Sequence, residues 1–392
     1  MKNLIITPII FFFSIAAFGQ SQADAVLESI RKNNKTVQAS RQYWTAQNTL
    51  AKTGTTPENP LVEYDHLYGS PEGAGIQKDF SVTQRLDFPT AYGYRSKVAD
   101  TRIEQNAYLQ KNAEQEVLLQ AKKVYIELIY QNKKQLALER RASISQKLFT
   151  DIKRKFDLQD ATVLDLNRIK VQLANAKSDL ILQKGKVSEL RTRLTELNGG
   201  IEISITDTIY PATSPVPDFE ELDSLIEAND PIVKSYEKDV EINQRQLSLI
   251  RALTLPKLET GYHSQNILGQ SYRGFHLGVT IPLWENKNKV KAQSQSLDYS
   301  SLRLQEHRIE HRYSNKEVYD RYLSVKQALS ETQSILGDLS TVPMLEKALR
   351  LGQITSIEYG NELSVYYSLQ ERLLELEKDY HLAIAELFKF ML

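Results

Sequence analysis

The stretch Lys78-Asp79-Phe80-Ser81-Val82-Thr83-Gln84-Arg85-Leu86-Asp87-Phe88-Pro89 decides the fold, together with a second stretch of the same kind from Phe275 to Trp284. In both stretches apolar and polar side chains alternate, so Phe80, Val82 and Leu86 share one face. An alternation of period two over about ten residues predicts a β-strand with one apolar and one polar face. Strands of this length with aromatic residues near their ends are typical of proteins that cross an outer membrane.

The composition narrows the class of protein. The chain has 392 residues and a formal net charge of +0, which gives no reason to expect a nucleic-acid partner. Only 12 prolines and 16 glycines favour long uninterrupted elements. With no cysteine, the chain has no disulfides, thiolate metal sites or cysteine nucleophile, and no N-terminal cysteine to carry a lipid.

The first 19 residues have the pattern of a secretory signal peptide. Lys2 supplies the positive start, residues 4–16 form the apolar core, and Ala17-Phe18-Gly19 fits a cleavage site. The alternative is a membrane anchor, but the apolar run is shorter than the roughly 20 residues of a spanning helix. We therefore expect an exported protein that enters a membrane, if at all, by its strands.

The same order of elements is predicted twice, with helices far longer than those of a compact domain. The first repeat, 20–198, comprises a helix at 23–52 that is interrupted at Asn33-Asn34, strands 61–68 and 78–88, a long helix 92–156 and a return helix 162–197. A linker, 199–217, precedes the second repeat, 218–392. That repeat comprises a helix 219–252, strands 257–265 and 273–283, a long helix 286–351 and a return helix 355–391.

Short sequence matches support an internal duplication. Leu27-Glu28-Ser29-Ile30 corresponds to Leu222-Asp223-Ser224-Leu225, and Asn34 corresponds to Asn229.

Each repeat supplies two strands, so one chain has four, which are too few to close a barrel. Open strand edges are not tolerated in lipid. Closure must therefore be intermolecular. Two chains would give eight strands with a filled interior, and three would give twelve strands around a lumen.

These features resemble the TolC-like outer-membrane efflux proteins over essentially the whole mature chain. The resemblance lies in the repeated order of elements, in the strand ends Val82-Thr83 and Val279-Thr280, and in Gly352-Gln353-Ile354-Thr355-Ser356-Ile357-Glu358 at the second helical turn. The short linker and the segment Thr83 to Pro89 look most like the heavy-metal branch of the family (CusC- and CzcC-like). The chain departs from the family in two places: Gln159 stands where the second turn has Gly352, and many relatives carry a lipidated cysteine that this sequence lacks.

The resemblance implies a mixed, mainly α fold of two tandem repeats. It implies a homotrimer with a 12-stranded transmembrane β-barrel in the outer membrane of a Gram-negative bacterium and an α-helical barrel in the periplasm. The expected partners are outer-membrane lipid, a periplasmic adaptor and an inner-membrane pump of the RND type. We expect a passive exit duct without catalytic residues, cofactor or bound metal, and the heavy-metal branch implies heavy-metal cations as cargo.

Two sets of polar residues are candidates for the wall of the duct. Alternation places one set in the barrel lumen: Glu63, Asp65, Arg85, Asp87, Glu259, His263 and His276. These residues either wet a water-filled pore or attract cations. The second set is acidic and marks the periplasmic aperture: Asp157, Asp160, Asp165 and Glu358. These carboxylates either form rings around the opening or serve as charges at helix N-termini. The adaptor-contact candidates at the same turns are Leu164, Thr162, Gly352, Thr355 and Ile357.

His307-Arg308-Ile309-Glu310-His311 fits the H-x-x-E-H pattern of some zinc peptidases. Such a pattern arises easily by chance in a long charged helix, and the first repeat has no counterpart. We therefore favour ordinary polar residues of a coiled coil. The alternative functions are a drug-efflux or type I secretion duct of the same fold and, in a different class, an exported soluble coiled-coil scaffold.

Overall fold

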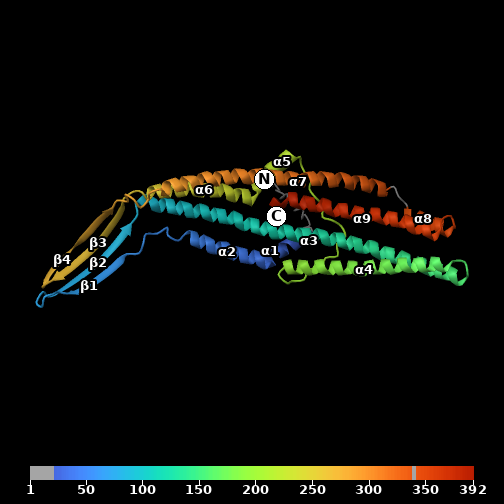
Figure 1. The fold of residues 1–392 in the computed structure, drawn as a ribbon, viewed down its shortest axis with the longest axis horizontal. Coiled ribbons are helices and arrows are strands. Elements are labelled where there is room, and N and C mark those ends of the chain that lie inside the picture. The colour runs from blue at the N-terminus through green and yellow to red at the C-terminus, as the bar shows by residue number, and fades with distance from the viewer. Residues whose placement is uncertain (1–21, 338–340) are drawn as a thin grey trace, which may run out of the picture.

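The computed structural model describes residues 22–337 and 341–392. The molecule is elongated, with a β-sheet at one end and long helices along the rest (Figure 1). The predicted signal peptide, residues 1–19, lies outside the described residues. Over the described ranges, no helix has both the length and the apolar character that crossing a membrane requires.

The sheet consists of four antiparallel strands in the order β1 (Leu61–Tyr68), β2 (Ile76–Leu86), β3 (Lys257–Ile267) and β4 (Gln270–Thr280). The two hairpins come from different halves of the chain and join through β2 and β3. One cross-strand row contains Val62, Val82, Tyr262 and Phe275. Because side chains alternate along each strand, this register gives the whole sheet one apolar and one polar face.

The strand ends differ from the prediction. The predicted strands 78–88 and 273–283 end two or three residues earlier, at Leu86 and Thr280. At the first junction the Asp87 backbone N–H donates to the Tyr92 hydroxyl at 3.0 Å, and Pro89 begins the next helix. Leu268 and Gly269 join β3 to β4 with φ values of 49° and 82°, as in a tight two-residue hairpin, so both strands extend further toward this turn than predicted.

The first half contains α1 (Gln22–Asn33), α2 (Lys35–Ala51), α3 (Pro89–Asp157) and α4 (Val163–Leu197). With 69 residues, α3 is about 100 Å long. The interruption predicted at Asn33-Asn34 separates α1 from α2. The Asn34 side chain accepts the Val37 N–H at 2.9 Å, which caps α2, and donates to the Leu197 carbonyl at 2.7 Å.

The second half contains α5 (Phe219–Asn229), α6 (Pro231–Ala252), α7 (Lys289–Gly337), α8 (Thr341–Arg350) and α9 (Ser356–Leu387), and ends in a 3₁₀ turn, Lys389–Met391. The predicted helix 219–252 is therefore two helices, divided at Asp230. Asp230 caps α6 by accepting the N–H groups of Ile232 and Val233. The counterpart of Asn34 is thus Asp230, and the predicted match with Asn229 is wrong by one residue.

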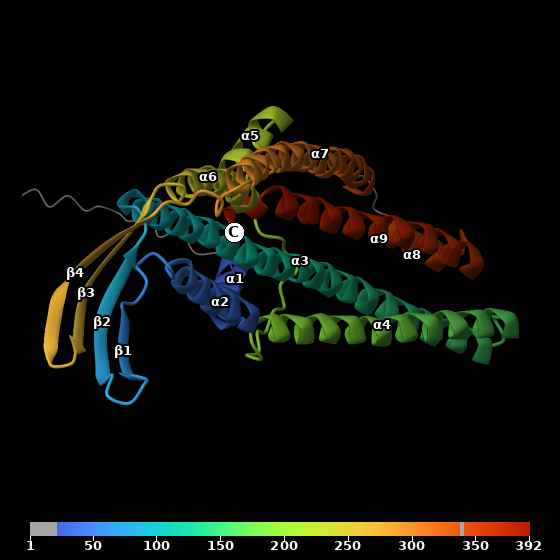
Figure 2. The ribbon, with the colours of Figure 1, turned by 60° about the vertical axis from the view of Figure 1, so that its left-hand side comes forward.

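The helices lie side by side in a fixed order. Near the sheet, α2 contacts α3, α3 contacts α6, and α6 contacts α7, which repeats the order of the four strands. Further from the sheet the order becomes α4, α3, α9, α7 (Figure 2). The largest buried cluster joins α1, α3 and α4 through residues such as Ile30, Leu118 and Leu194. Thus α7 forms one flank of the molecule, and the stacked α2 and α4 form the other.

The turns α3–α4 and α8–α9 lie together at the end far from the sheet (Figure 1). Both reverse the chain through one residue with positive φ, Gln159 at 63° and Gly352 at 68°. The N–H of the next residue then reaches back to a carbonyl of the last helical turn: Asp160 to Lys155 at 2.8 Å, and Gln353 to Ala348 at 2.9 Å. These are the bonds of a Schellman motif, in which glycine is the favoured residue.

This equivalence predicts opposite effects for two substitutions. Gln159→Gly should raise the free energy of unfolding by about 1 kcal/mol, because the left-handed backbone is strained for a residue with a Cβ. Gly352→Ala should lower it by a similar amount, although a methyl group would meet no atom within 4 Å. Thermal unfolding of the two purified variants measures both effects. Two shifts of the same sign would contradict the equivalence of the turns.

Candidate functional site

The polar face of the sheet gathers the predicted duct-lining residues of the strands. Glu63 lies opposite Ser81, and Ser81 opposite His263. The cross-strand register places the following side chains on this face: Glu63, Asp65, Arg85, Glu259, His263 and His276. Residues from both halves of the chain therefore form one continuous polar surface, as the alternation predicted.

Polar side chains link three strands at the helical end of this face. Arg85 Nε donates to Glu259 Oε2 at 2.8 Å, and His276 Nε2 lies 3.4 Å from Glu259 Oε1. Glu259 thus receives an arginine from β2 and a histidine from β4. The cluster joins the two hairpins across the β2–β3 pairing.

Asp87 lies just beyond the end of β2 and borders one hollow with Arg85, Lys257 and Glu259, so its place in the lumen stays a prediction. It follows the last residue of β2 and forms an ion pair with Arg95 on α3. The period-two pattern continues through Asp87 in the sequence, but the chain has already turned toward the helix. The carboxylate therefore fixes the junction between strand and helix.

Asp79 is a residue of the polar face that the prediction missed. It lies directly opposite Asp65. Gln77 Nε2 donates to Asp79 Oδ2 at 2.7 Å, whereas Oδ1 is buried without a hydrogen-bond partner. Both carboxylates border a hollow of about 270 Å³ that also includes Glu63, His263 and His276. Like charges opposite each other on a sheet are unfavourable, and the alternation two residues before Ser81 was the signal that could have identified Asp79.

The opposite face of the sheet is apolar and open. Phe275 is 92% exposed and Leu277 is 82% exposed, and Val62, Tyr64 and Phe80 on neighbouring strands are exposed as well. An apolar surface of this extent is unusual on a monomer in water and marks a contact with lipid or protein.

Two of the acidic candidates at the helical turns, Asp165 and Glu358, take part in capping their helices. Thr162 Oγ1 accepts the Asp165 N–H at 3.1 Å, and Asp165 Oδ2 accepts the Thr162 N–H at 3.1 Å. Thr355 and Glu358 form the same reciprocal pair, at 3.2 and 2.8 Å. These are capping boxes. The hydroxyl and backbone donors of the threonines lower the pKa of both carboxyl groups, so both are ionised at neutral pH.

The other tip candidates lie at the surface. Asp157 and Asp160 are exposed, and so are Leu164 (75%) and Ile357 (45%). Beneath them, Tyr359 and Leu363 of α9 pack with Ile152 and Ile169 of the first half. A shared apolar cluster therefore holds the two turns together as one surface, on which Thr162, Gly352 and Thr355 also lie.

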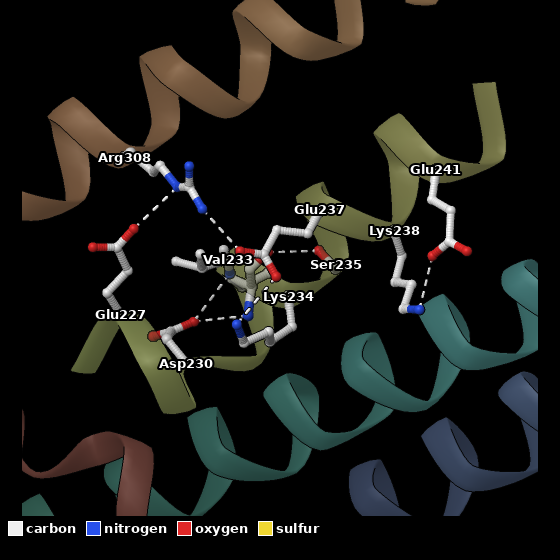
Figure 3. A network of polar contacts seen from close by, with 10 residues as sticks. Glu227, Asp230, Val233, Lys234, Ser235, Glu237, Lys238, Glu241 and Arg308 are labelled. Atoms are coloured by element: carbon white, nitrogen blue, oxygen red, sulfur yellow. Dashed lines mark hydrogen bonds and ion pairs between the residues drawn. The ribbon is translucent and has the colours of Figure 1, made fainter. Parts of the chain in front are cut away.

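The residues of the H-x-x-E-H pattern attach α7 to α5 and α6. His307 stacks on Tyr236 with ring centroids 4.4 Å apart. Arg308 forms ion pairs with Glu227 at 3.0 Å and Glu237 at 2.8 Å (Figure 3). His311 Nε2 lies 3.3 Å from Asp230 Oδ2. His307, Arg308 and His311 thus each contact different residues of the neighbouring helices.

The electrostatics of this cluster follow from its burial. Burial raises the pKa of Asp230, but the hydrogen bond and charge of His311 outweigh it, and the pKa lies below its usual value. Burial lowers the pKa of His307, and the neighbouring His311 adds to this effect. Across residues 22–337 and 341–392, no three His, Asp or Glu side chains are gathered so that they could hold a metal ion.

Sequence comparisons identify no relative: no family model matches the chain, and no curated protein does. Solved structures match over almost its whole length. CusC, described in terms of transmembrane channel formation, has a TM-score of 0.77 at 14% identity, over 95% of this chain and 92% of its own. The outer-membrane channel OprN has a TM-score of 0.77 at 11% identity, over 94% and 89%. VceC, an outer membrane protein of Vibrio cholerae, has a TM-score of 0.69 at 11% identity, over 94% of both chains.

The chain therefore has the fold of these outer-membrane proteins, and the predicted TolC-like fold is confirmed. CusC and OprN match equally well, so the fold does not distinguish the heavy-metal branch.

The capping boxes predict which tip carboxylate is structural. Asp165→Ala and Thr162→Ala should each lower stability, by about 1 kcal/mol for the threonine, because they leave N–H groups at the start of α4 without acceptors. Asp160→Ala should leave the melting temperature unchanged. Because the pKa of Asp165 is lowered, its contribution is present above the usual carboxyl pKa and is lost as the pH falls through the lowered value. Equal melting temperatures for Asp165→Ala and Asp160→Ala would contradict the capping role.

Proposed function

We propose that this protein is the outer-membrane exit duct of a tripartite efflux pump, a passive channel without an active site. The observation that carries the proposal is the division of the sheet into an exposed apolar face and a polar face. The apolar face is suited to contact with lipid, and the polar face is suited to line a water-filled lumen. The fold shared with outer-membrane channels and the long helices on one side of the sheet support the same assignment.

A homotrimer would provide hydrogen-bond partners for the two free edges of the sheet. Within the described residues, β1 and β4 are each paired on one side only. Pairing β1 of one copy with β4 of the next would use both edges, and three copies would form a twelve-stranded barrel with a lumen. The polar face would line this barrel, with its acidic residues and histidines turned toward the passing substrate.

The helices support the same head-to-tail contact. On α7, Tyr299, Leu302, Ile309 and Tyr313 are at least 60% exposed and recur at intervals of three, seven and four residues. The opposite flank also exposes apolar side chains, Tyr43 and Leu50 on α2 and Val171, Ile181 and Leu182 on α4. Stripes with this spacing pack in coiled coils, so α7 of one protomer would lie against α2 and α4 of the next.

The tips provide the surface for the periplasmic partner. Leu164 and Ile357 are exposed apolar residues on a turn pair that is rigidly capped, which suits docking of an adaptor. We assign the adaptor and an inner-membrane pump of the RND type as partners, and place the helices in the periplasm. The exposed Asp157 and Asp160 would then repeat around the periplasmic opening and favour cations.

Heavy-metal cations are the cargo that the lining favours. The carboxylates of Glu63, Asp65, Asp79 and Glu259 outnumber the cations Arg85 and Lys257 on the polar face. Such a surface lowers the barrier to a metal ion. A drug-efflux duct or a type I secretion duct would share the fold and need no such bias.

Disrupting the α7 stripe should prevent assembly. Ile309→Arg places a charge in the proposed interface, so the variant should run as a monomer in detergent, whereas the unaltered protein should run as a trimer. Ser314→Arg is the matched control, because Ser314 is exposed on a different side of the same helix. Light scattering after size exclusion measures both. A monomeric unaltered protein would contradict the trimer.

The cargo can be tested with a deletion strain. We expect sensitivity to copper, zinc, cobalt or cadmium salts, and restoration by the unaltered gene but not by the Ile309→Arg form. Sensitivity confined to dyes, detergents and antibiotics would replace the metal assignment with drug efflux.

Single-channel recording in planar bilayers tests whether the protein forms a channel at all. If no conductance were observed and the protein could be extracted without detergent, the soluble scaffold would be favoured.

A further inference from the structure

The loop between β4 and α7, residues 281–288, exposes three large apolar side chains. Ile281 is 65%, Leu283 68% and Trp284 79% exposed. The corresponding link in the first half is only residues 87–88, because β2 continues to Leu86 and α3 begins at Pro89. In the second half the strand ends earlier and the helix begins later, so these side chains lie outside the sheet.

Polar residues of the same loop are turned toward the protein. Glu285 accepts two hydrogen bonds from Lys257 Nζ, at 2.8 and 3.0 Å. The Asn286 side chain donates to the Leu253 carbonyl at 2.7 Å, which ties the loop to the end of α6. A turn closes between the Trp284 carbonyl and the Lys287 N–H at 3.1 Å. The loop is therefore fastened on its polar side, and Leu283 and Trp284 remain at the surface.

The position of the loop indicates what covers it. It continues the apolar side of β4, on which Phe275, Leu277 and Val279 are exposed, toward the helices. Exposed lysines follow at 287, 289 and 291. Tryptophan prefers the boundary between acyl chains and headgroups, and lysines beside it attract lipid phosphates. Apolar side chains followed by a row of lysines match that boundary.

We propose that Ile281, Leu283 and Trp284 form an anchor that inserts into the phospholipid leaflet facing the periplasm. The inference rests on the proposed function, which places the apolar face of the sheet in lipid and the helices in the periplasm. The anchor fixes the depth of the barrel in the membrane. The equivalent β2–α3 junction of the first half exposes one large apolar side chain, Phe88 at 36%.

The chain offers its own reporter, because it contains only two tryptophans, Trp44 and Trp284. In a Trp44→Phe protein reconstituted into phosphatidylethanolamine and phosphatidylglycerol vesicles, emission comes from Trp284 alone. Phosphatidylcholine that is brominated near the headgroup end of its acyl chain should quench this emission more strongly than phosphatidylcholine that is brominated near the end of the chain. Trp44 on α2 is the control: the Trp284→Phe protein should show no quenching. Trp44→Tyr replaces Trp44→Phe if the latter does not fold.

A third variant separates the inference from the proposed function. Phe275→Trp, in a chain without the two native tryptophans, reports on the apolar face of the sheet. Quenching at 275 without quenching at Trp284 would overturn the anchor and leave the duct intact, and a neighbouring protomer would then cover the loop. No quenching at either position would overturn the membrane-spanning sheet, and the anchor with it.

Discussion

The unpaired edges of β1 and β4 are the constraint on which the rest of the structure depends. Each edge presents N–H and C=O groups that must find partners, and lipid offers none. Four strands are too few to close around a lumen, so in lipid the edges can be satisfied only by another chain. On the proposed arrangement, this requirement determines the oligomer, and the oligomer then determines which surfaces of the helices are buried.

The helices repeat the order of the strands, so a single kind of contact between neighbouring protomers would serve both the sheet and the helices. Because α2, α3, α6 and α7 follow β1 to β4, the flank that carries β4 also carries α7, and the flank that carries β1 also carries α2. Tyr43 and Leu50 on one flank and Leu302 and Ile309 on the other are exposed in the single chain. A head-to-tail contact that pairs the strands would cover these residues at the same time.

The sequence predicted what depends on local periodicity. Alternation identified both faces of the sheet, and the predicted return helices 162–197 and 355–391 begin at the two capping threonines. It failed where distant residues decide the local structure. The alternation runs on through Asp87 and Leu283, but Tyr92 and Lys257 hold these junctions outside the strands.

The sequence analysis also did not predict the register between neighbouring strands. The opposition of Asp65 and Asp79 depends on how the β1–β2 hairpin closes, which the alternation within a single strand does not encode. The acidic residues at the tips show a similar limit, since the sequence placed Asp165 and Glu358 in the first turns of their helices, but only the hydrogen bonds show that they cap them.

The two halves join their helices at the middle of the molecule by different chemistry. In the first half the break is held by neutral groups: Asn34 donates to the Leu197 carbonyl, and Ser29 donates to Asn198 at 2.9 Å. In the second half Asp230 faces His311, and Arg312 donates to the buried carboxylate of Asp223 at 2.6 Å.

This difference has a physical consequence. Amide contacts are insensitive to salt and to pH, whereas a buried carboxylate that loses its cation leaves an uncompensated charge. The attachment of α5 and α6 to α7 therefore depends on ion pairs at the break itself. In the first half the ion pairs lie on either side of the break, where Arg31 and Arg41 both contact Glu114 of α3. The break lies at Asn34 in one half and at Asp230 in the other, and each of these residues caps the helix that follows it, but the contacts around the break differ between the halves.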